Sequence, residues 1–260
     1  MSAPAGVGGR VLAGEDAIDP RELEAIAARG WQAVESEALG GWRLHAALGK
    51  SGRINACWTH APPDREPEAA IAAVEAWYAA RGFPPRFKVV DEIAGPPDIG
   101  ARLARRGYRL YTPTLTMIGR LAGAPDPAVA VHAAPSDAYQ RIFADPAFGD
   151  PVDARERLEA LGRIPPPRGY ALLSLDGEPA AIGACAVEGA WAGVMGMRTA
   201  PAFRRRGLAR RVFRALAAFA LQAGAARGYL QVDAANASAI ALYRSEGFET
   251  LYRYQYWIRD

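Results

Sequence analysis

The sequence predicts an α+β fold, in which a mixed but mostly antiparallel sheet carries helices on both faces. Three observations support this prediction. Segments with apolar residues at helical spacing alternate with shorter apolar runs typical of strands. Glycine and proline mark the boundaries between these segments. The end of the first half also resembles the end of the second, which indicates two related units. A chain of 260 residues with 50% apolar side chains is long enough for one or two cores of ordinary size.

The first half of the chain alternates between expected helices and strands. Residues 1–15 are expected to form a flexible tail. From Pro20 onward, Leu23 and Ile26 share one face of a short amphipathic helix that ends near Gly30. Spacing and flanking turn residues then predict strands over 42–48, 53–60 and 86–90, helices over 68–80 and 99–106, and a long strand over 108–120.

The second half begins after a linker at 123–128, which contains the run Gly-Ala-Pro-Asp-Pro. Ser136 is an expected helix N-cap, and Asp176-Gly177 between two apolar runs predicts a β-hairpin. Strands are expected over 129–133, 170–175, 179–187, 191–197 and 228–233, helices over 136–143, 153–161 and 207–222, and a further helix from 236 followed by a β-rich tail.

The segment from Val194 to Phe213 has the pattern of a strand, a loop and a helix start that bind phosphate. The first turn of a helix offers backbone N–H groups without an intrahelical acceptor, and the helix dipole favours an anion there. Gly207 and the small Ala209 allow a ligand to approach this backbone closely. Three consecutive arginines at 204–206 add positive charge suited to a diphosphate.

Two motifs in this half resemble the GNAT N-acetyltransferase family. The sequence R-x-x-G-x-A at 204–209, after a strand and Pro201, resembles motif A of the family. The sequence N-x-x-A-x-x-x-Y-x-x-x-G-F at 236–248, after the strand that ends at Asp233, resembles its motif B. Together the motifs cover about half of the chain, from about residue 131 to the end. The resemblance implies a GNAT domain that binds acetyl-CoA.

The resemblance also implies roles for individual residues. In the family, the diphosphate lies on the loop and helix start, and the pantetheine arm lies along the exposed edge of the preceding strand, as a peptide does in β-augmentation. The implied cofactor contacts are Met197, Thr199, Arg204, Arg205, Arg206, Gly207, Leu208, Ala209, Arg210 and Asn236. The arginine cluster has the alternative interpretation of a solvated helix face, and Asn236 that of a helix cap.

Two residues are candidates for proton transfer. Tyr243 in the second motif would donate a proton to the leaving thiolate, unless it is an ordinary core aromatic residue. Glu188 is a candidate base, and deprotonation through solvent is the favoured alternative. Cys185 lies in an expected strand and is not assigned as a nucleophile, so the amine would attack the thioester directly. The Met197 amide would polarise the carbonyl of the thioester.

Residues 100–108 align without a gap with residues 240–248, and Gly107-Tyr108 matches Gly247-Phe248. The first half nevertheless lacks the R-x-x-G pattern, and Leu103 stands where the second half has Tyr243. The sequence therefore predicts tandem GNAT-like domains, with a degenerate one at 16–122 that has no cofactor site and a catalytic one at 129–260. In this organisation the chain resembles bacterial proteins with a degenerate amino-terminal GNAT domain and an active carboxy-terminal one.

The predicted function is the transfer of an acetyl group from acetyl-CoA to a primary amine in a ternary complex. The acceptor is expected to be a small molecule or a peptide, and no metal, nucleic acid or membrane is expected to take part. The protein could be a monomer or a homodimer. A non-catalytic CoA-binding regulatory or structural module is the alternative. A third interpretation, a nucleic-acid-binding protein, rests only on the isoelectric point of about 9.0 and on the number of arginines. Two widely spaced cysteines and no long apolar run favour a cytoplasmic protein.

Overall fold

A computed structural model describes residues 17–259, and the predicted tail at 1–15 lies outside this range. The helices are α1 (Pro20–Gly30), α2 (Pro67–Ala79), α3 (Ile99–Arg105), α4 (Asp137–Phe143), α5 (Pro151–Gly162), α6 (Leu208–Gln222) and α7 (Ala237–Ser245). The strands are β1 (Glu35–Leu39), β2 (Trp42–Ala46), β3 (Cys57–Trp58), β4 (Arg86–Val90), β5 (Arg109–Arg120), β6 (Val129–His132), β7 (Arg168–Leu175), β8 (Glu178–Glu188), β9 (Trp191–Thr199), β10 (Arg227–Asp233) and β11 (Glu249–Ile258).

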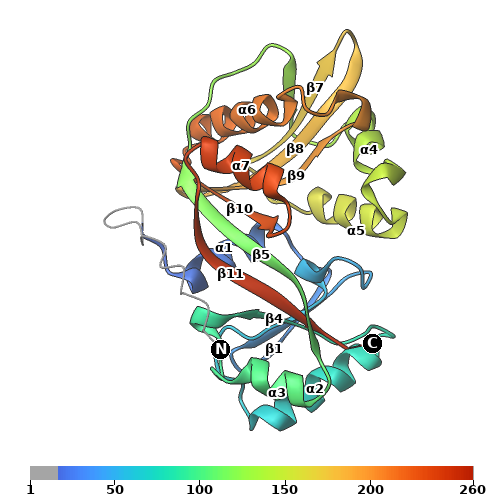
Figure 1. Cartoon of the computed structure of the whole chain (residues 1–260), viewed down its shortest axis with the longest axis vertical. Coiled ribbons are helices and arrows are strands. Elements are labelled where there is room, and N and C mark those ends of the chain that lie inside the picture. The colour runs from blue at the N-terminus through green and yellow to red at the C-terminus, as the bar shows by residue number, and fades with distance from the viewer. Residues whose placement is uncertain (1–16, 260) are drawn as a thin grey trace, which may run out of the picture.

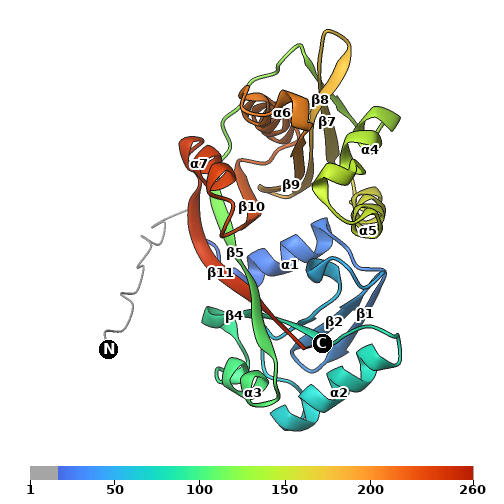
Figure 2. The same cartoon turned by 45° about the vertical axis from the view of Figure 1, so that its right-hand side comes forward.

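The strands form one mixed sheet whose order is β1-β2-β3-β4-β11-β5-β10-β9-β8-β7-β6. The two halves of the chain exchange strands in its centre. The last strand, β11, pairs with β4 and β5, and β5 pairs in turn with β10 of the second half. Figures 1 and 2 show β5 and β11 running side by side from the upper to the lower part of the molecule. The division at residues 123–128 stays a prediction, but strands from both sides of it share this sheet.

Helices pack on both faces of the sheet, which confirms the predicted α+β class. Helix α6 packs on β7, β8 and β9 (Figure 1), because its Leu208, Val212 and Leu216 lie on one buried face. Helix α4 contacts the same strands and, with α5, contributes Tyr139, Ile142, Phe143, Ala160 and Leu161 to a separate apolar cluster. In the lower part, α2 and α3 cover β2 and β4 through a further buried cluster.

Several local signals in the sequence are confirmed. The Ser136 Oγ accepts a hydrogen bond of 3.3 Å from the Tyr139 amide at the start of α4. Asp176 and Gly177 have φ angles of 51° and 82°, as the hairpin between β7 and β8 requires. Both features depend only on neighbouring residues, so the sequence predicts them well.

The expected strand at 53–60 is wrong in most of its length. Residues Gly52–Ile54 form a 3₁₀ turn, and only Cys57–Trp58 pair in the sheet. The sequence analysis also missed β1, whose first four residues are exposed at the edge of the sheet. An exposed edge strand with the sequence Glu-Ser-Glu-Ala carries no apolar pattern that would reveal it.

Candidate active site

The loop before α6 forms an open backbone cradle. Gly207 caps the helix in the left-handed conformation, with φ 73°, and Arg205 is left-handed as well, with φ 61°. No atom lies within 4 Å of where a Cβ on Gly207 would be, so the space beside this backbone is open. The first amides of α6 have no acceptor within the helix. The left-handed pair and the free amides together give the geometry of an anion-binding nest.

The arginines around this loop fall into two groups. On the face of α6, Arg210 and Arg214 pair with Glu246, at 3.0 and 2.8 Å, and Arg211 pairs with Asp126. On the loop itself, the residues from Arg204 to Arg206 have no carboxylate partner in the described part of the chain. The helix arginines therefore stabilise the fold, whereas the loop arginines keep their charge available to an anion.

Strands β9 and β10 separate beside this loop. Their parallel pairing runs from Trp191–Arg227 to Val194–Leu230 and stops there, although both strands continue. A bulge lies at this point of β9, where Gly196 has φ 64° and the register with β8 shifts. Beyond the bulge, the backbone edge of β9 that faces β10 is unpaired. Met197 and Thr199 lie on this unpaired stretch.

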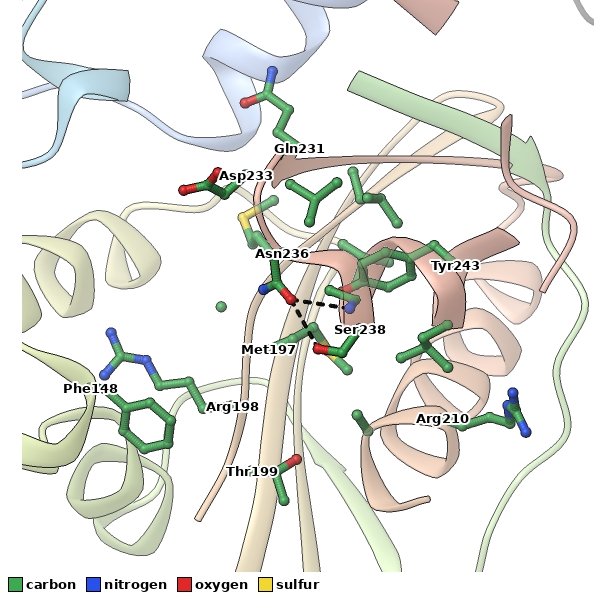
Figure 3. A pocket seen from close by; sticks show the side chains of 18 of the residues that line it. Phe148, Met197, Arg198, Thr199, Arg210, Gln231, Asp233, Asn236, Ser238 and Tyr243 are labelled. Carbon is green, nitrogen blue, oxygen red and sulfur yellow. Dashed lines mark hydrogen bonds between the residues drawn. The ribbon is translucent and has the colours of Figure 1, made fainter. Parts of the chain in front are cut away.

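A cavity of about 890 Å³ occupies the opening between these strands and extends to the loop (Figure 3). It is lined by every predicted cofactor residue except Arg206, namely by Met197, Thr199, Arg204, Arg205, Gly207, Leu208, Ala209, Arg210 and Asn236. The predicted acid, Tyr243, lines it as well. The structure thus brings together residues that lie on four separate elements.

Tyr243 lies on α7 and is buried against Phe213, with ring centroids 5.6 Å apart. Burial raises the pKa of its hydroxyl to about 12, so the group stays protonated at neutral pH. Asn236 caps α7, because its Oδ1 accepts hydrogen bonds of 3.1 Å from the Ala239 amide and the Ser238 hydroxyl (Figure 3). The cap prediction for Asn236 is confirmed, and its amide nitrogen is not used by the cap.

The predicted base candidate, Glu188, lies elsewhere. It is at the end of β8 and forms an ion pair with Arg29 of α1, with Nη2 and Oε1 2.5 Å apart. It does not line the cavity. Cys185 is buried within β8, and burial raises the pKa of its thiol to about 12, which leaves it as an unreactive thiol.

Sequence analysis missed the carboxylate that does line the cavity, Asp233 at the end of β10. In Figure 3 its carboxylate points toward the open space between β10 and α5. Its one available signal was its position at the end of a strand with parallel pairing, which is where sites form in α/β sheets. Two nearby aspartates have structural roles, because Asp145 and Asp150 are helix N-caps whose side chains accept hydrogen bonds from backbone amides.

A second cavity, of about 740 Å³, reaches from the first into the lower part of the molecule. The two cavities share Arg53, Phe148, Arg157, Gln231 and Asp233. The far wall of the second comes from the first half of the chain and includes Lys50, Arg86 and Tyr111. The two cavities thus adjoin at these five residues, and residues of the first half of the chain line the second cavity.

The fold is that of the GNAT N-acetyltransferases. A GCN5-related N-acetyltransferase from Kribbella flavida superposes with a TM-score of 0.65 at 17% identity, over 91% of this chain and 94% of the other. A tandem GNAT protein from the clavulanic acid biosynthesis pathway superposes with a TM-score of 0.58 at 15% identity, over 91% and 87%. At such identities these structures show the fold alone.

The family model described as "Probable histone acetyltransferase Rv0428c C-terminal" matches residues 18–257, and the chain belongs to this family within the GNAT superfamily. The chain is 25% identical to the uncharacterized N-acetyltransferase YobR of Bacillus subtilis, over 93% of its length and 99% of the relative. It is 29% identical to the probable histone acetyltransferase Rv0428c of Mycobacterium tuberculosis, over 91% of its length and 72% of the relative. Within the described residues, no helix is long and apolar enough to cross a membrane.

Proposed function

We propose that the protein transfers an acetyl group from acetyl-CoA to a primary amine by direct attack in a ternary complex. The observation that supports this most strongly is the continuous cavity, which joins a phosphate-binding loop, an unpaired strand edge and a buried tyrosine. These are the three features that a long anionic thioester requires. Its relatives named as N-acetyltransferases point to the same reaction class.

The lining of the cavity supports one orientation for the proposed acetyl-CoA. The diphosphate would lie at Gly207 and the first amides of α6, where the unpaired Arg204 and Arg205 supply charge. The pantetheine amides would bond the unpaired edge of β9 at Met197 and Thr199, as an added strand would. The thioester would then lie between β9 and α7, near Tyr243.

The proposed reaction needs no covalent enzyme intermediate. The ammonium group of the acceptor loses a proton to water, and its nitrogen lone pair attacks the thioester carbonyl carbon. The new C–N bond forms as the C–S bond breaks, and the Met197 amide stabilises the negative charge that develops on oxygen. Tyr243 donates a hydrogen bond and a proton to the departing sulfur, and it regains a proton, through solvent, as the newly acylated nitrogen loses its second proton. Water is the proposed proton acceptor because Glu188 is held by Arg29 outside the cavity.

The non-catalytic alternative is a module that binds CoA without turnover. Such a module needs the loop and the strand edge but has no use for an open second cavity beside the thioester end. That cavity favours an enzyme with an acceptor. The name of the mycobacterial relative suggests a lysine of a histone as one acceptor class for the present protein.

The proposal is tested by calorimetric titration of the full chain with acetyl-CoA. One binding site per chain is expected. Gly207→Glu should lower the affinity by about 100-fold or more, about 2.7 kcal/mol, because it places a strained and negatively charged residue in the cradle.

Gly82→Glu is the matched control. Gly82 has φ 69° and open space around it, so the substitution has the same backbone strain and charge, but it lies beyond α2 and away from the cavity. The affinity of the Gly82→Glu variant for acetyl-CoA should equal that of the unaltered chain. Equal affinities in all three proteins would refute the placement of the cofactor.

A further inference from the structure

Four of the charged groups on the wall of the second cavity form two ion pairs. Lys50 pairs with Asp150 at 3.0 Å, and Arg157 pairs with Asp153 at 2.7 Å. Because oppositely charged groups so close together neutralise one another, these two pairs offer little net charge to a ligand.

Three charged groups on this wall lack such a partner among the described residues. Arg53 stacks over the ring of Trp31 at 5.5 Å, and Arg86 donates a hydrogen bond of 3.1 Å to the Lys50 carbonyl, but neither meets a carboxylate. Asp233 accepts only a backbone hydrogen bond, of 2.8 Å, from Ala235. Arginine stays charged in every protein environment, so Arg53 and Arg86 are uncompensated cations.

The positions of these groups give the cavity a polarity. Asp233 and Arg53 line both cavities, so they lie where the acceptor would meet the thioester. Arg86 lines only the second cavity, farther into the first half of the chain. Aromatic side chains lie along the same wall and include Tyr111, Tyr254 and Tyr256. The space thus has a carboxylate and a guanidinium group where the two cavities meet, tyrosine rings along its wall, and a second guanidinium group farther into the first half of the chain.

We propose, on the basis of the function proposed above, that the acceptor is an amine that also carries a carboxylate, with Asp233 binding its ammonium group and Arg53 and Arg86 its carboxylate. A guanidinium group binds a carboxylate with two parallel hydrogen bonds, which fixes orientation as well as affinity. The first half of the chain then supplies the specificity of the acceptor site. A basic histone tail is disfavoured, because it would bring further positive charge toward two unpaired arginines.

The test measures kcat/KM of the full chain for pairs of amines that differ by one carboxylate: phenylalanine and phenethylamine, lysine and cadaverine, 6-aminohexanoate and pentylamine. A basic lysine-containing peptide is assayed beside them. At least one carboxylated amine should exceed its decarboxylated partner and the peptide by about tenfold or more, since a charge-assisted bidentate contact contributes on that order.

Arg53→Gln and Arg86→Gln should each reduce this preference, because kcat/KM should fall more for the carboxylated amines than for their decarboxylated partners. Arg105→Gln, an exposed arginine in the same half that lines neither cavity, is the matched control and should keep the preference. Asp233→Asn should raise KM for every amine. All four variants should bind acetyl-CoA as the unaltered chain does, which also shows that they fold.

Three results would overturn the proposal: the decarboxylated amines or the peptide react as well as the carboxylated ones, the preference survives in both arginine variants, or no amine of the panel reacts although acetyl-CoA binds. The proposed function fails separately, if acetyl-CoA does not bind.

Discussion

Neighbouring residues in this chain differ in function because of what surrounds each one. Arg204 and Arg205 lie on the open loop with no carboxylate partner among residues 17–259, whereas Arg210, in the first turn of α6, pairs with Glu246. Tyr243 and Tyr139 are both buried aromatic residues with raised pKa values, yet only Tyr243 lines the cavity. Burial by itself therefore does not identify a functional tyrosine, and its access to the cavity has to be considered as well.

The first prediction concerns the hydroxyl of Tyr243. Tyr243→Phe should lower kcat by about 100-fold, the lower end of the range for the loss of a general acid. Affinity for acetyl-CoA should change little, because the aromatic ring stays packed on Phe213. Steady-state kinetics and calorimetry on the same preparation measure the two quantities. Undiminished kcat would make Tyr243 an ordinary core residue.

Tyr139→Phe serves as the control, since the Tyr139 hydroxyl is buried without a hydrogen-bond partner among the described residues and its loss should leave kcat unchanged.

The pH dependence of kcat gives a second check on Tyr243. Burial raises the pKa of Tyr243 from its ordinary value near 10 to about 12, so the acid form persists as pH rises. The kcat should hold between about pH 8 and pH 10. A decline centred near pH 10 would indicate an exposed, unperturbed tyrosine.

At the scale of the element, the bulge in β9 creates the space for the cofactor. An unbroken strand would continue its pairing with β10 past Val194, and the edge proposed to bind pantetheine would be occupied. Gly196 permits the bulge because its φ of 64° is strained for residues with a Cβ. One residue thus turns a continuous parallel pair into two diverging strands.

The second prediction follows from this bulge. Gly196→Ala should lower the free energy of unfolding by about 1 to 2 kcal/mol, the cost of a left-handed residue with a Cβ, and should also weaken acetyl-CoA binding. Gly189→Ala, in the turn before β9, introduces the same strain at φ 55° with no atom within 4 Å. Urea denaturation should show a loss of stability in both variants, and a larger one in Gly196→Ala, because the new Cβ would lie 3.2 Å from the Phe143 ring. Cofactor affinity should fall in Gly196→Ala alone, and a fall in both or in neither would contradict the role of the bulge.

At the scale of the whole molecule, the two halves of the chain are interlocked. Strand β11 lies between β4 and β5, and β5 lies between β11 and β10, so each half completes the sheet of the other. A buried ion pair adds to this. Lys88 of β4 pairs with Glu24 of α1, and Glu24 accepts a hydrogen bond of 2.8 Å from Tyr252 of β11. Removal of one half would expose long unpaired strand edges in the other.

The third prediction is that the chain unfolds as one unit. In urea, tryptophan fluorescence, which reports largely on the first half through Trp42, Trp58 and Trp77, should give the same midpoint as far-UV circular dichroism, which reports on the whole chain. Saturating acetyl-CoA should shift both midpoints equally, because the ligand stabilises the single folded state. Two separate midpoints would show that the halves unfold independently in spite of the shared strands.

The sequence by itself determined the features that depend on neighbouring residues. The caps at Ser136 and Asn236 and the turn at Asp176-Gly177 follow from side chains within a few positions. The GNAT resemblance rested on two such local motifs, which is why the superfamily was predicted correctly.

Only the tertiary structure decided which distant residues meet. It paired Glu188 with Arg29, set Asp233 in the cavity wall, and placed Arg53 of the first half where the two cavities join. It also set β11 between β4 and β5. Sequence spacing carries no information on such contacts, because they are fixed by how strands from opposite ends of the chain satisfy one another's backbone hydrogen bonds and bury their apolar faces.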